Sequence, residues 1–595
     1  MDQKMKMAEQ FALIVQKGMT GDADEMLREL KKSVAPDDYL SEDLCVTAAY
    51  LYNRLGDKDE ELYYLSKGML INPESPSLFV SLADHYAGIN PVQELICLYQ
   101  AGFYAKKYGD EEKKALIEQI TAALIKNGVS VPRTSFVILS YNTKEYIEQC
   151  LNSIRDTVPD DRAEIVVVDN ASTDGSLDYL RSLDYITLVE NQENHGFPGG
   201  CNDGIAACSE GNDIYLLNSD TILSPNSLFW LKIGLYENDN IGSSGSVTNY
   251  AANGQSIYDP SWKSLEDYLS FGRRNNIALQ YPYIYKTFLI GFSLLLKRTV
   301  LEVTGTLDER FNPGNSEDVD LGFRMLKAGY LNVLCTNSFV FHYGSKSFEQ
   351  LQKSGQIYND LLDINETKLH DKLGFDPWAY HHYRNDIVDE MTAERDEPVR
   401  VLEIGTGMGA TASLIRSRFP NCEYTGIERN ETIASYAKAF GRVYAVDAEE
   451  ADLSEITGDK GYDYVILGDT LGCFRDPEVM LDKIAGILKK RGRLIISIPN
   501  VRHWSVLLPL INEDRFSYGA DGILSQDTVR LFTENEAARL ISGAGFSIRN
   551  IKRNIAGELE EDDRKELKSI AQLSGGDLND FLARQYIFTA EKSNG

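Results

Sequence analysis

The chain has 595 residues, of which 43% are hydrophobic and 25% charged, a globular composition over a length that predicts three or four domains. Its net charge of −30 disfavours binding to nucleic acid or to an anionic bilayer. The N-terminus lacks the apolar run of a signal peptide, and the longest apolar stretch (287–296) is short for a membrane span. The eight cysteines include no CxxC pair. We therefore expect a cytoplasmic protein with no membrane span and no disulfides.

Residues 1–130 are predicted to be helical throughout, because apolar positions recur every three or four residues. Turns are predicted at 56–57, 72–73 and 90–91, where Gly-Asp and Asn-Pro pairs occur. A weak repeat has a period of 34 residues, in which Ala49, Tyr52, Glu60 and Leu62 recur as Ala83, Tyr86, Glu94 and Ile96. This period and the segment 48–73 resemble the tetratricopeptide repeat (TPR) family, which implies a TPR-like surface for an extended polypeptide or a protein partner. The alternative is an ordinary helical bundle.

The pattern changes at residue 134 to alternating strands and helices. The runs 135–140 and 163–170 are short and apolar and end in polar residues, and an amphipathic helical stretch at 144–154 lies between them. Strand, helix and strand in this order predict a parallel sheet with crossover helices, in an α/β domain over residues 133–350. Residues 351–395 are predicted to be a helical extension or linker, and a second α/β pattern covers residues 396–593.

Polar residues and glycines follow the predicted strands of the 133–350 region. Ligands of open α/β sheets bind at the carboxyl ends of the strands, so these residues are candidates for a binding site. The candidates are Ser140, Asn142, Asp169, Asn170, Asp174, Gly199, Gly200 and Asn202. Among them, Asp169 and Asn170 can hydrogen-bond the base or ribose of a nucleotide. The glycine pair lets the backbone come close to a ligand.

Acids and a histidine follow later strands of the same region. Asp220 comes just past a buried strand, where a carboxylate can hold a divalent cation against a diphosphate. Glu317, Asp318 and Asp320 cluster at a probable helix start, and a clustered carboxylate with a raised pKa can serve as a general base. His342 follows a short apolar strand and is a candidate metal ligand. Each feature alone has a structural alternative. The NSD segment alone is usually a strand end, the helix macrodipole favours acids at a helix start, and a single histidine is more often structural than a ligand.

Taken together and in this order, the motifs resemble the family 2 glycosyltransferases of the GT-A fold, which are Rossmann-like. The matching segments are SYN, VVVDNASTDGS, NHGFPGGCNDG, LLNSDT, GFSLLLKR, EDVDLGFR and FHYGS, over roughly residues 133–350. The resemblance implies a nucleotide-diphosphate sugar donor bound by the candidates above, with Mn²⁺ or Mg²⁺ held by Asp220, the last residue of the DXD motif, and by His342. It implies Asp318 as the catalytic base, with Glu317 as the alternative, and a single displacement with inversion. Asn218 replaces the first acid of the DXD motif.

The last region begins with a strand and a glycine-rich turn, Glu403 to Gly409, which also fits a dinucleotide site. Glu428 ends the next predicted strand, where an acid can bind both hydroxyls of a ribose. With the GDTL and IPNVRHWS segments, residues 396–593 resemble class I S-adenosylmethionine-dependent methyltransferases, of Rossmann fold. The resemblance implies the cofactor-binding residues Glu403, Gly405 and Gly407 (methionine part), Glu428 (ribose), Asp447 (near the adenine) and Asp469.

Two departures leave methyl transfer open. Gly472 and Cys473 replace an acid–histidine pair of some relatives, and Thr528 replaces a histidine. The domain is therefore expected to be either an active methyltransferase, which would methylate the product, or a degenerate structural module.

Three hypotheses for the whole chain follow. In the first, a bacterial glycosyltransferase transfers a sugar, such as GlcNAc or rhamnose, to a surface protein such as flagellin, which the helical region holds. In the second, the acceptor is a cell-surface polysaccharide of the O-antigen or rhamnan type. In the third, the chain is a binding scaffold with inactive domains.

Overall fold

The computed structural model describes residues 28, 41–344, 358–519, 522–555 and 559–593. The chain divides into two compact units, one formed by residues up to 284 and 288–369, the other by 285–287 and 370 onwards. Within the described ranges, no helix has the length and apolar character needed to cross a bilayer.

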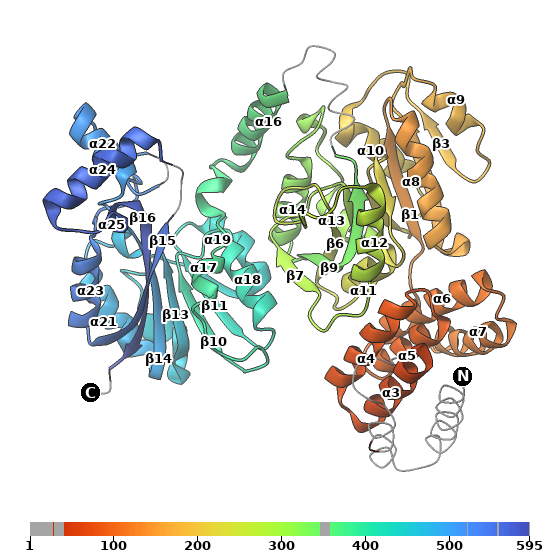
Figure 1. The fold of residues 1–595 in the computed structure, drawn as a ribbon, viewed down its shortest axis with the longest axis horizontal. Coiled ribbons are helices and arrows are strands. Elements are labelled where there is room, and N and C mark those ends of the chain that lie inside the picture. The colour runs from red at the N-terminus through yellow and green to blue at the C-terminus, as the bar shows by residue number, and fades with distance from the viewer. Residues whose placement is uncertain (1–27, 29–40, 345–357, 520–521, 556–558, 594–595) are drawn as a thin grey trace. The chain divides into compact units, whose positions relative to one another are not determined.

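The first unit begins with helices alone, coloured red to orange in Figure 1. The helices are α3 (Glu42–Leu55), α4 (Lys58–Ile71), α5 (Pro76–Tyr86), α6 (Pro91–Lys107) and α7 (Glu111–Lys126). The predicted turns are confirmed, because Gly56 ends α3 with a φ of 75°, Asn72 ends α4, and the Asn90 side chain accepts hydrogen bonds from the first amides of α6. Helical structure is thus confirmed for residues 42–126, while TPR character stays a prediction; residues 1–27 and 29–40 of the predicted domain lie outside the described residues.

These helices share a hydrophobic core with the α/β domain that follows. The ring of Phe79 in α5 meets Phe229 of helix α11 edge-on, with centroids 4.9 Å apart. Ala49 and Ala83, which are equivalent in the predicted repeat, are both buried in this core. The helical region and the α/β domain are therefore one packed body.

The α/β domain contains a nine-stranded mixed sheet. Its strands are β1 (Thr134–Ser140), β2 (Ala163–Asp169), β3 (Thr187–Glu190), β4 (Asp213–Leu217), β5 (Thr221–Leu223), β6 (Ile241–Val247), β7 (Tyr283–Lys286), β8 (Ser293–Leu296) and β9 (Leu331–His342). The order is β3-β2-β1-β4-β8-β6-β9-β5, with β7 on β9. Strands β1, β2, β3 and β4 are parallel, as predicted, whereas β8 runs antiparallel to both β4 and β6.

The helices of this domain connect the strands. They are α8 (Lys144–Thr157), α9 (Ser176–Arg181), α10 (Gly196–Ala207), α11 (Ser227–Leu235), α12 (Leu265–Asn275), α13 (Arg298–Thr304) and α14 (Glu317–Lys327). Helix α16 (Tyr358–Leu373) and the short helices at Pro377–Tyr380 and α17 (Asn385–Val388) occupy the described part of the predicted extension.

The second unit is a seven-stranded sheet in the order β12-β11-β10-β13-β14-β16-β15, with β16 antiparallel to both neighbours. Its strands are β10 (Arg400–Ile404), β11 (Glu423–Glu428), β12 (Arg442–Ala445), β13 (Tyr462–Gly468), β14 (Leu488–Pro499), β15 (Phe546–Ile555) and β16 (Ala583–Lys592). Its helices are α18 (Ala410–Arg418), α19 (Glu431–Ala437), α20 (Leu453–Thr457), α21 (Pro477–Ile487), α22 (Trp504–Glu513), α23 (Glu534–Gly543), α24 (Glu561–Ser574) and α25 (Asn579–Leu582).

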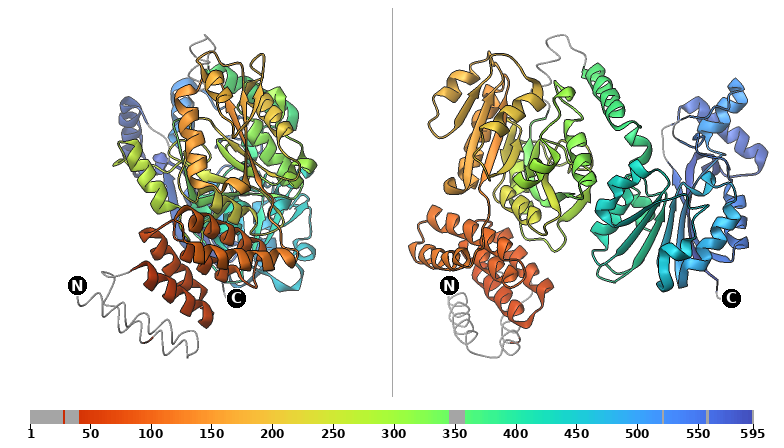
Figure 2. Two further views of the ribbon diagram at one scale, coloured as in Figure 1. Left: turned by 90° about the vertical axis from the view of Figure 1, so that its right-hand side faces the viewer. Right: turned by 180° about the vertical axis from the view of Figure 1, so that it is seen from behind.

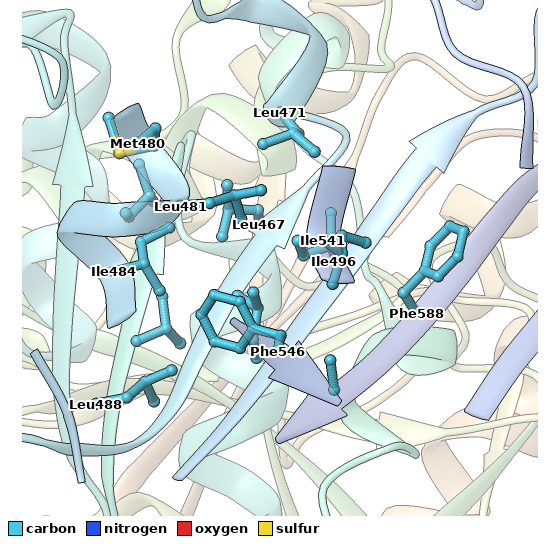
Figure 3. Packing of buried hydrophobic residues seen from close by; sticks show 14 of the residues in the cluster. Leu467, Leu471, Met480, Leu481, Ile484, Leu488, Ile496, Ile541, Phe546 and Phe588 are labelled. Atoms are coloured by element: carbon cyan, nitrogen blue, oxygen red, sulfur yellow. The ribbon is translucent and has the colours of Figure 1, made fainter. Parts of the chain in front are cut away.

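Helices cover both faces of this second sheet (Figure 2). On one face, Met480, Leu481 and Ile484 of α21 pack with Ile541 of α23 against strand residues such as Leu467 (Figure 3). This is a Rossmann-like arrangement, in which the carboxyl ends of the central parallel strands are left for a ligand.

Candidate functional sites

The first candidate site begins at the carboxyl ends of β1 and β2. The register of the two strands places Ser140 beside Asp169. Asp169 is buried, and its Oδ2 accepts a hydrogen bond from the Ser172 amide at 3.0 Å, while Oδ1 has no hydrogen-bond partner in the structure. A buried carboxylate oxygen without a partner is costly, so it is suited to a ligand that donates a hydrogen bond.

Asn142 and Asp174 support the neighbouring loop. Asn142 Oδ1 accepts from the Thr173 amide at 2.8 Å, and Asp174 accepts from the amides of Lys144 and Ser176 at 2.9 Å each. Burial raises the pKa of Asp174, but the hydrogen bonds from Ser176 and Lys144 outweigh it and leave the pKa below its ordinary value. Both side chains therefore hold the 171–176 loop at the start of α8.

Asn170 organises the segment that leads into α10. Its Oδ1 accepts from Asn191 Nδ2 at 3.0 Å and from the His195 amide at 3.1 Å, and its Nδ2 donates to Asn194 Oδ1 at 2.7 Å. Each of these three bonds goes to a residue within 191–195, so Asn170 acts here as a brace for that loop.

The glycines and Asn202 of α10 are explained by packing. A Cβ on Gly200 would overlap the Leu139 side chain of β1, so this glycine lets the helix lie close to the sheet. Asn202 accepts from the Leu307 amide at 3.1 Å and donates to the Leu307 carbonyl and to Glu309 at 2.9 Å. The sequence-based reason for these residues was a close ligand; the structure supplies a structural reason, and a ligand contact stays a prediction.

Asp220 and His342 lie together beyond β4 and at the end of β9. His342 Nε2 is 3.3 Å from Asp220 Oδ1, and its Nδ1 lies 3.0 Å from the Tyr250 carbonyl. Because a carbonyl only accepts, Nδ1 carries a proton and Nε2 faces the carboxylate. Burial lowers the pKa of His342, but the hydrogen bond and charge of Asp220 raise it above its ordinary value. Asn218 Nδ2 lies 3.4 Å from the same Nε2.

The acids of α14 differ in their surroundings. Glu317 is buried, and its Oε2 has no hydrogen-bond partner; burial and the charge of Asp318 raise its pKa well above the ordinary range. Burial also raises the pKa of Asp318, but amides of Gly291 and Val319 donate to it at 3.0 and 2.8 Å and favour its charged form. Asp320 pairs with Arg324 at 2.8 Å and stabilises the helix.

One short segment connects the two groups of acids. Gly291 donates its amide to Asp318, and the ring of the next residue, Phe292, stacks on the His342 ring with centroids 5.2 Å apart. The Phe292 carbonyl also accepts from the Asn218 amide at 2.9 Å. Two adjacent residues, Gly291 and Phe292, therefore link Asp318 to the Asp220–His342 pair.

The second candidate site surrounds the glycine turn after β10. Glu403 is buried, and its Oε2 accepts hydrogen bonds from Tyr424 at 2.5 Å and Thr406 at 3.1 Å. Burial raises the pKa of Glu403 to about 7 even though these hydrogen bonds lower it. Gly407 has a φ of 54°, and a Cβ there would crowd the Tyr380 carbonyl, so only glycine fits without strain.

The remaining cofactor candidates lie at the ends of β11, β12 and β13. Glu428 is buried and accepts from the Gly407 amide at 3.1 Å; burial raises its pKa, although amides of Asn430 and Gly407 lower it. Asp469 accepts from Ser497 Oγ at 2.7 Å and pairs with Arg384 at 2.7 Å. Asp447 is exposed, and its side chain accepts from the Glu449 amide at 2.9 Å.

Comparisons with known proteins identify both domains. Residues 135–304 match the family model "Glycosyl transferase family 2", and residues 378–551 match the model "Methyltransferase domain". The chain carries a family 2 glycosyltransferase domain and a methyltransferase domain. Both belong to enzyme families.

Individual relatives cover parts of the chain. Glycosyltransferase AglE of Haloferax volcanii is 26% identical over 43% of this chain and 86% of its own length. Malonyl-[acyl-carrier protein] O-methyltransferase of Bacillus cytotoxicus is 30% identical over 22% of this chain and 50% of its own length. A solved mannosyltransferase of Pyrobaculum calidifontis is 20% identical over 42% of this chain and 72% of its own, with a TM-score of 0.28. The chain spans only 16% to 42% of the other curated relatives.

Sequence reasoning missed the residues that hold the glycosyltransferase site together. Asn249 bonds both the amide and the carbonyl of His342, at 2.9 and 2.8 Å. Gln255 accepts from the Ile290 amide at 2.7 Å, directly before Gly291. In the methyltransferase domain, Arg384 was missed in the same way. These residues carry no local motif, and only the fold brings them to the site.

Proposed function

We propose that the middle domain is an inverting, metal-dependent glycosyltransferase that moves a sugar from a nucleotide-diphosphate donor to a hydroxyl acceptor. The observation that carries this proposal is the segment 291–292, whose amide holds Asp318 and whose ring stacks on His342, the partner of Asp220. A base and a cation-binding pair at one site are what a single displacement at a sugar carbon needs.

The side chains present fit a divalent cation. Asp220 Oδ1 and His342 Nε2 face each other, and the buried Asn218 Oδ1 beside them has no hydrogen-bond partner. The carboxylate and amide oxygens suit Mn²⁺ or Mg²⁺, and a neutral imidazole is a common ligand of divalent metals. The described residues contain no cluster of three or more His, Cys, Asp or Glu side chains that could hold a metal ion, so substrate oxygens and water would complete the shell. When bound, the cation would supply charge that offsets the departing nucleoside diphosphate.

The protein's own residues account for the rest of the mechanism. Asp169, with its unpartnered Oδ1, accepts a hydrogen bond from the nucleoside part of the donor. Asp318, fixed by two backbone amides, takes the proton from the acceptor hydroxyl as that oxygen attacks the anomeric carbon. Glu317, which its raised pKa keeps protonated, does not compete for this role. One displacement inverts the configuration without a covalent enzyme intermediate.

The methyltransferase domain is proposed to bind S-adenosylmethionine at the glycine turn. Glu428 stands at the end of β11 with its carboxylate beside the Gly407 amide, where the ribose hydroxyls can replace that contact. The cofactor would supply the methyl group, and the glycosylated product is the proposed acceptor. Asp469, at the end of β13, is proposed to contact the same cofactor.

The acceptor proposed for the glycosyltransferase is a polypeptide, such as a bacterial surface protein of the flagellin kind. The helical region packs directly on α11 of the glycosyltransferase domain, which supports a role in holding an extended chain. A polysaccharide acceptor of the O-antigen or rhamnan type is the second candidate, and a scaffold with inactive domains the third.

The test is hydrolysis and transfer by the purified chain with a panel of nucleotide-sugars. Mn²⁺ should support hydrolysis and EDTA should remove it. Asp220→Ala should abolish hydrolysis, whereas Asp178→Ala, an exposed acid of α9, should leave it unchanged. A mass increase on an added protein supports the polypeptide acceptor, and a further gain of about 14 mass units with S-adenosylmethionine shows methyl transfer. Hydrolysis that is absent, or indifferent to Asp220→Ala, would favour the scaffold.

A further inference from the structure

The loop that leads into α14, the helix that carries Asp318, has an uncommon backbone. Asn315 and Ser316 are the last two residues before this helix begins, and their φ values are 77° and 74°. Left-handed backbone is unfavourable for a residue with a side chain, and it persists where the surrounding structure holds it. Ser316 is the N-cap of α14, and its carbonyl accepts from the Asp320 amide at 2.9 Å. The start of α14, and with it the place of Asp318, therefore depends on what holds this loop.

A buried asparagine of α16 bonds the loop. Asn365 is 1% exposed, and its Nδ2 donates to the carbonyls of Phe311 and Gly314 at 2.7 Å each. A third, longer contact of 3.3 Å reaches the Asn315 carbonyl. Carbonyl oxygens only accept, so the side of the amide that faces the loop is Nδ2. One side chain thus fixes the loop at both of its ends.

A lysine of the same helix fixes the other side of the Asn365 amide. Lys368 Nζ donates to Asn365 Oδ1 and to the Arg310 carbonyl, at 2.8 Å each. Residues three apart lie on the same face of a helix, so both side chains of α16 reach the loop together. The amide is therefore held in one orientation, with its acceptor on the lysine and its donors on the loop.

The start of α10 bonds the residues in the middle of the loop. The Pro313 carbonyl accepts from the Phe197 amide at 2.8 Å, and Asn312 Oδ1 accepts from the Gly199 amide at 3.4 Å. Every residue from 310 to 315 thus has a hydrogen bond to α10 or α16. All of these residues belong to the first compact unit.

We propose that Asn365 is a positioning residue for Asp318, and that the catalytic body of the glycosyltransferase domain includes α16 as far as residue 369. Neither the predicted bounds of the domain, 133–350, nor the region that matches the family model, 135–304, includes this helix. Asp318 must lie where the Gly291 amide donates to it at 3.0 Å. A displaced start of α14 would lengthen that bond and move the base away from the acceptor oxygen. The inference rests on the proposed function, because Asn365 has this role only if Asp318 is the base.

The test compares Asn365→Leu with the unaltered full chain in steady-state hydrolysis, with Mn²⁺, of whichever UDP-, GDP- or dTDP-linked sugar the unaltered chain hydrolyses fastest. Water takes the place of the acceptor, so Asp318 is the base in this reaction too. The value of kcat should fall by about 10- to 100-fold through misplacement of the base, while KM for the nucleotide-sugar changes by less than about threefold. The acid limb of the pH profile should move to higher pH, because a longer bond from the Gly291 amide favours the charged form of Asp318 less.

Two further variants separate positioning from loss of stability. Lys368→Met removes the donor to Asn365 Oδ1 and to the Arg310 carbonyl, so it should lower kcat and move the acid limb in the same directions by smaller amounts. This variant decides the question if Asn365→Leu does not fold. Thr367→Ala is the matched control, because Thr367 is an exposed residue of α16 whose hydroxyl donates to the Asp363 carbonyl within the helix. It should leave kcat and the pH profile unchanged. Thermal unfolding of each variant allows the rates to be expressed per folded molecule.

A lower temperature of unfolding with kcat and the pH profile unchanged would overturn the proposal, because Asn365 would then only stabilise the fold. A raised KM at unchanged kcat would also overturn it. Absence of hydrolysis in the unaltered chain would contradict the proposed function and this inference with it. Hydrolysis that is indifferent to both Asn365→Leu and Lys368→Met would overturn the inference alone, so the two failures are distinguishable.

Discussion

Asp318 and Glu317 are adjacent acids at the start of α14, yet their hydrogen bonds differ. Asp318 accepts two amide hydrogen bonds, whereas Glu317 Oε2 has no partner. We expect Asp318→Asn to lower the rate of sugar transfer by about 10²- to 10⁴-fold, because the base is lost, with donor binding retained. Burial raises the pKa of Asp318, so the rate of the unaltered chain should fall on acidification at a higher pH than an exposed aspartate would give. Steady-state rates across pH measure both effects.

Asp320 provides the contrast, because its carboxylate is bonded to Arg324 at 2.8 Å within the same helix. Asp320→Asn should lower the temperature of unfolding and leave the rate per folded molecule nearly unchanged. If Glu317→Gln removed the activity while Asp318→Asn kept it, the role of base would pass to Glu317.

Gln255 is expected to position Asp318 without touching the substrate. It accepts from the Ile290 amide at 2.7 Å and donates to the Ser246 carbonyl at 3.1 Å, and the next amide along the chain, Gly291, binds Asp318. Gln255→Leu should lower kcat by about 10- to 100-fold through misplacement of the base and should move the acid limb of the pH profile to higher pH. Gln255→Glu keeps the acceptor and should restore part of the rate. An unchanged pH profile in Gln255→Leu would refute this positioning.

The sequence was sufficient to predict candidate site residues whose side chains are acidic or histidine. Asp220 and His342 could be chosen because each follows an apolar strand, and Asp318 because acids cluster at a predicted helix start. In the structure, residues 291 and 292 link Asp318 to the Asp220–His342 pair; the roles of all three stay predictions. Gly291, Phe292 and Gln255 could not be chosen, because a backbone amide, a ring and a buried amide side chain are ordinary core features. Their contacts join residues distant in sequence, which only the fold brings together.

At the scale of elements, α10 shows how packing explains a motif that suggested a ligand. A Cβ on Gly200 would overlap Leu139 and lie 3.3 Å from Asn170 Nδ2. Gly200→Ala should therefore destabilise the fold by about 1–3 kcal/mol, because the helix must move away from the sheet. Gly102→Ala in α6 is the control, since its Cβ would make an ordinary contact at 3.6 Å with Ile117 and alanine favours a helix. Chemical denaturation of both variants measures the difference, and an unchanged stability in Gly200→Ala would contradict the packing argument.

Local sequence patterns predicted the bounds of strands and helices better than they predicted which of these elements pack against each other. The apolar runs at 135–140 and 163–170 became β1 and β2 with nearly the same bounds, and the Gly-Asp and Asn-Pro turns end or begin helices as expected. Hydrophobic periodicity is set by residues close together in sequence, so it is sufficient to predict strands and helices of this kind. The antiparallel pairing of β8 with β4 and β6, and the packing of α5 and α6 on α11, depend on contacts between residues distant in sequence. No local pattern specifies such contacts.

At the scale of the molecule, the two compact units each have their own core and their own candidate ligand site. The helical region, in contrast, shares its core with the glycosyltransferase domain. Substitutions in one candidate site are therefore expected to leave the ligand of the other site bound normally. Each site is built from residues of its own unit, and substitutions without shared partners contribute nearly independently.

A crossed pair of substitutions tests this independence. Glu428→Gln removes the negative charge that is expected to bind the ribose hydroxyls, while one oxygen remains for the Gly407 amide, 3.1 Å away in the unaltered chain. It should weaken the binding of S-adenosylmethionine by about 10- to 100-fold, the effect of a hydrogen bond to a charged group, and leave nucleotide-sugar hydrolysis unchanged. Asp220→Ala should do the reverse. Calorimetry with the cofactor and hydrolysis assays on both variants give four results. Loss of cofactor binding in Asp220→Ala, or of hydrolysis in Glu428→Gln, would mean that the two sites are coupled and that each unit cannot be treated by itself.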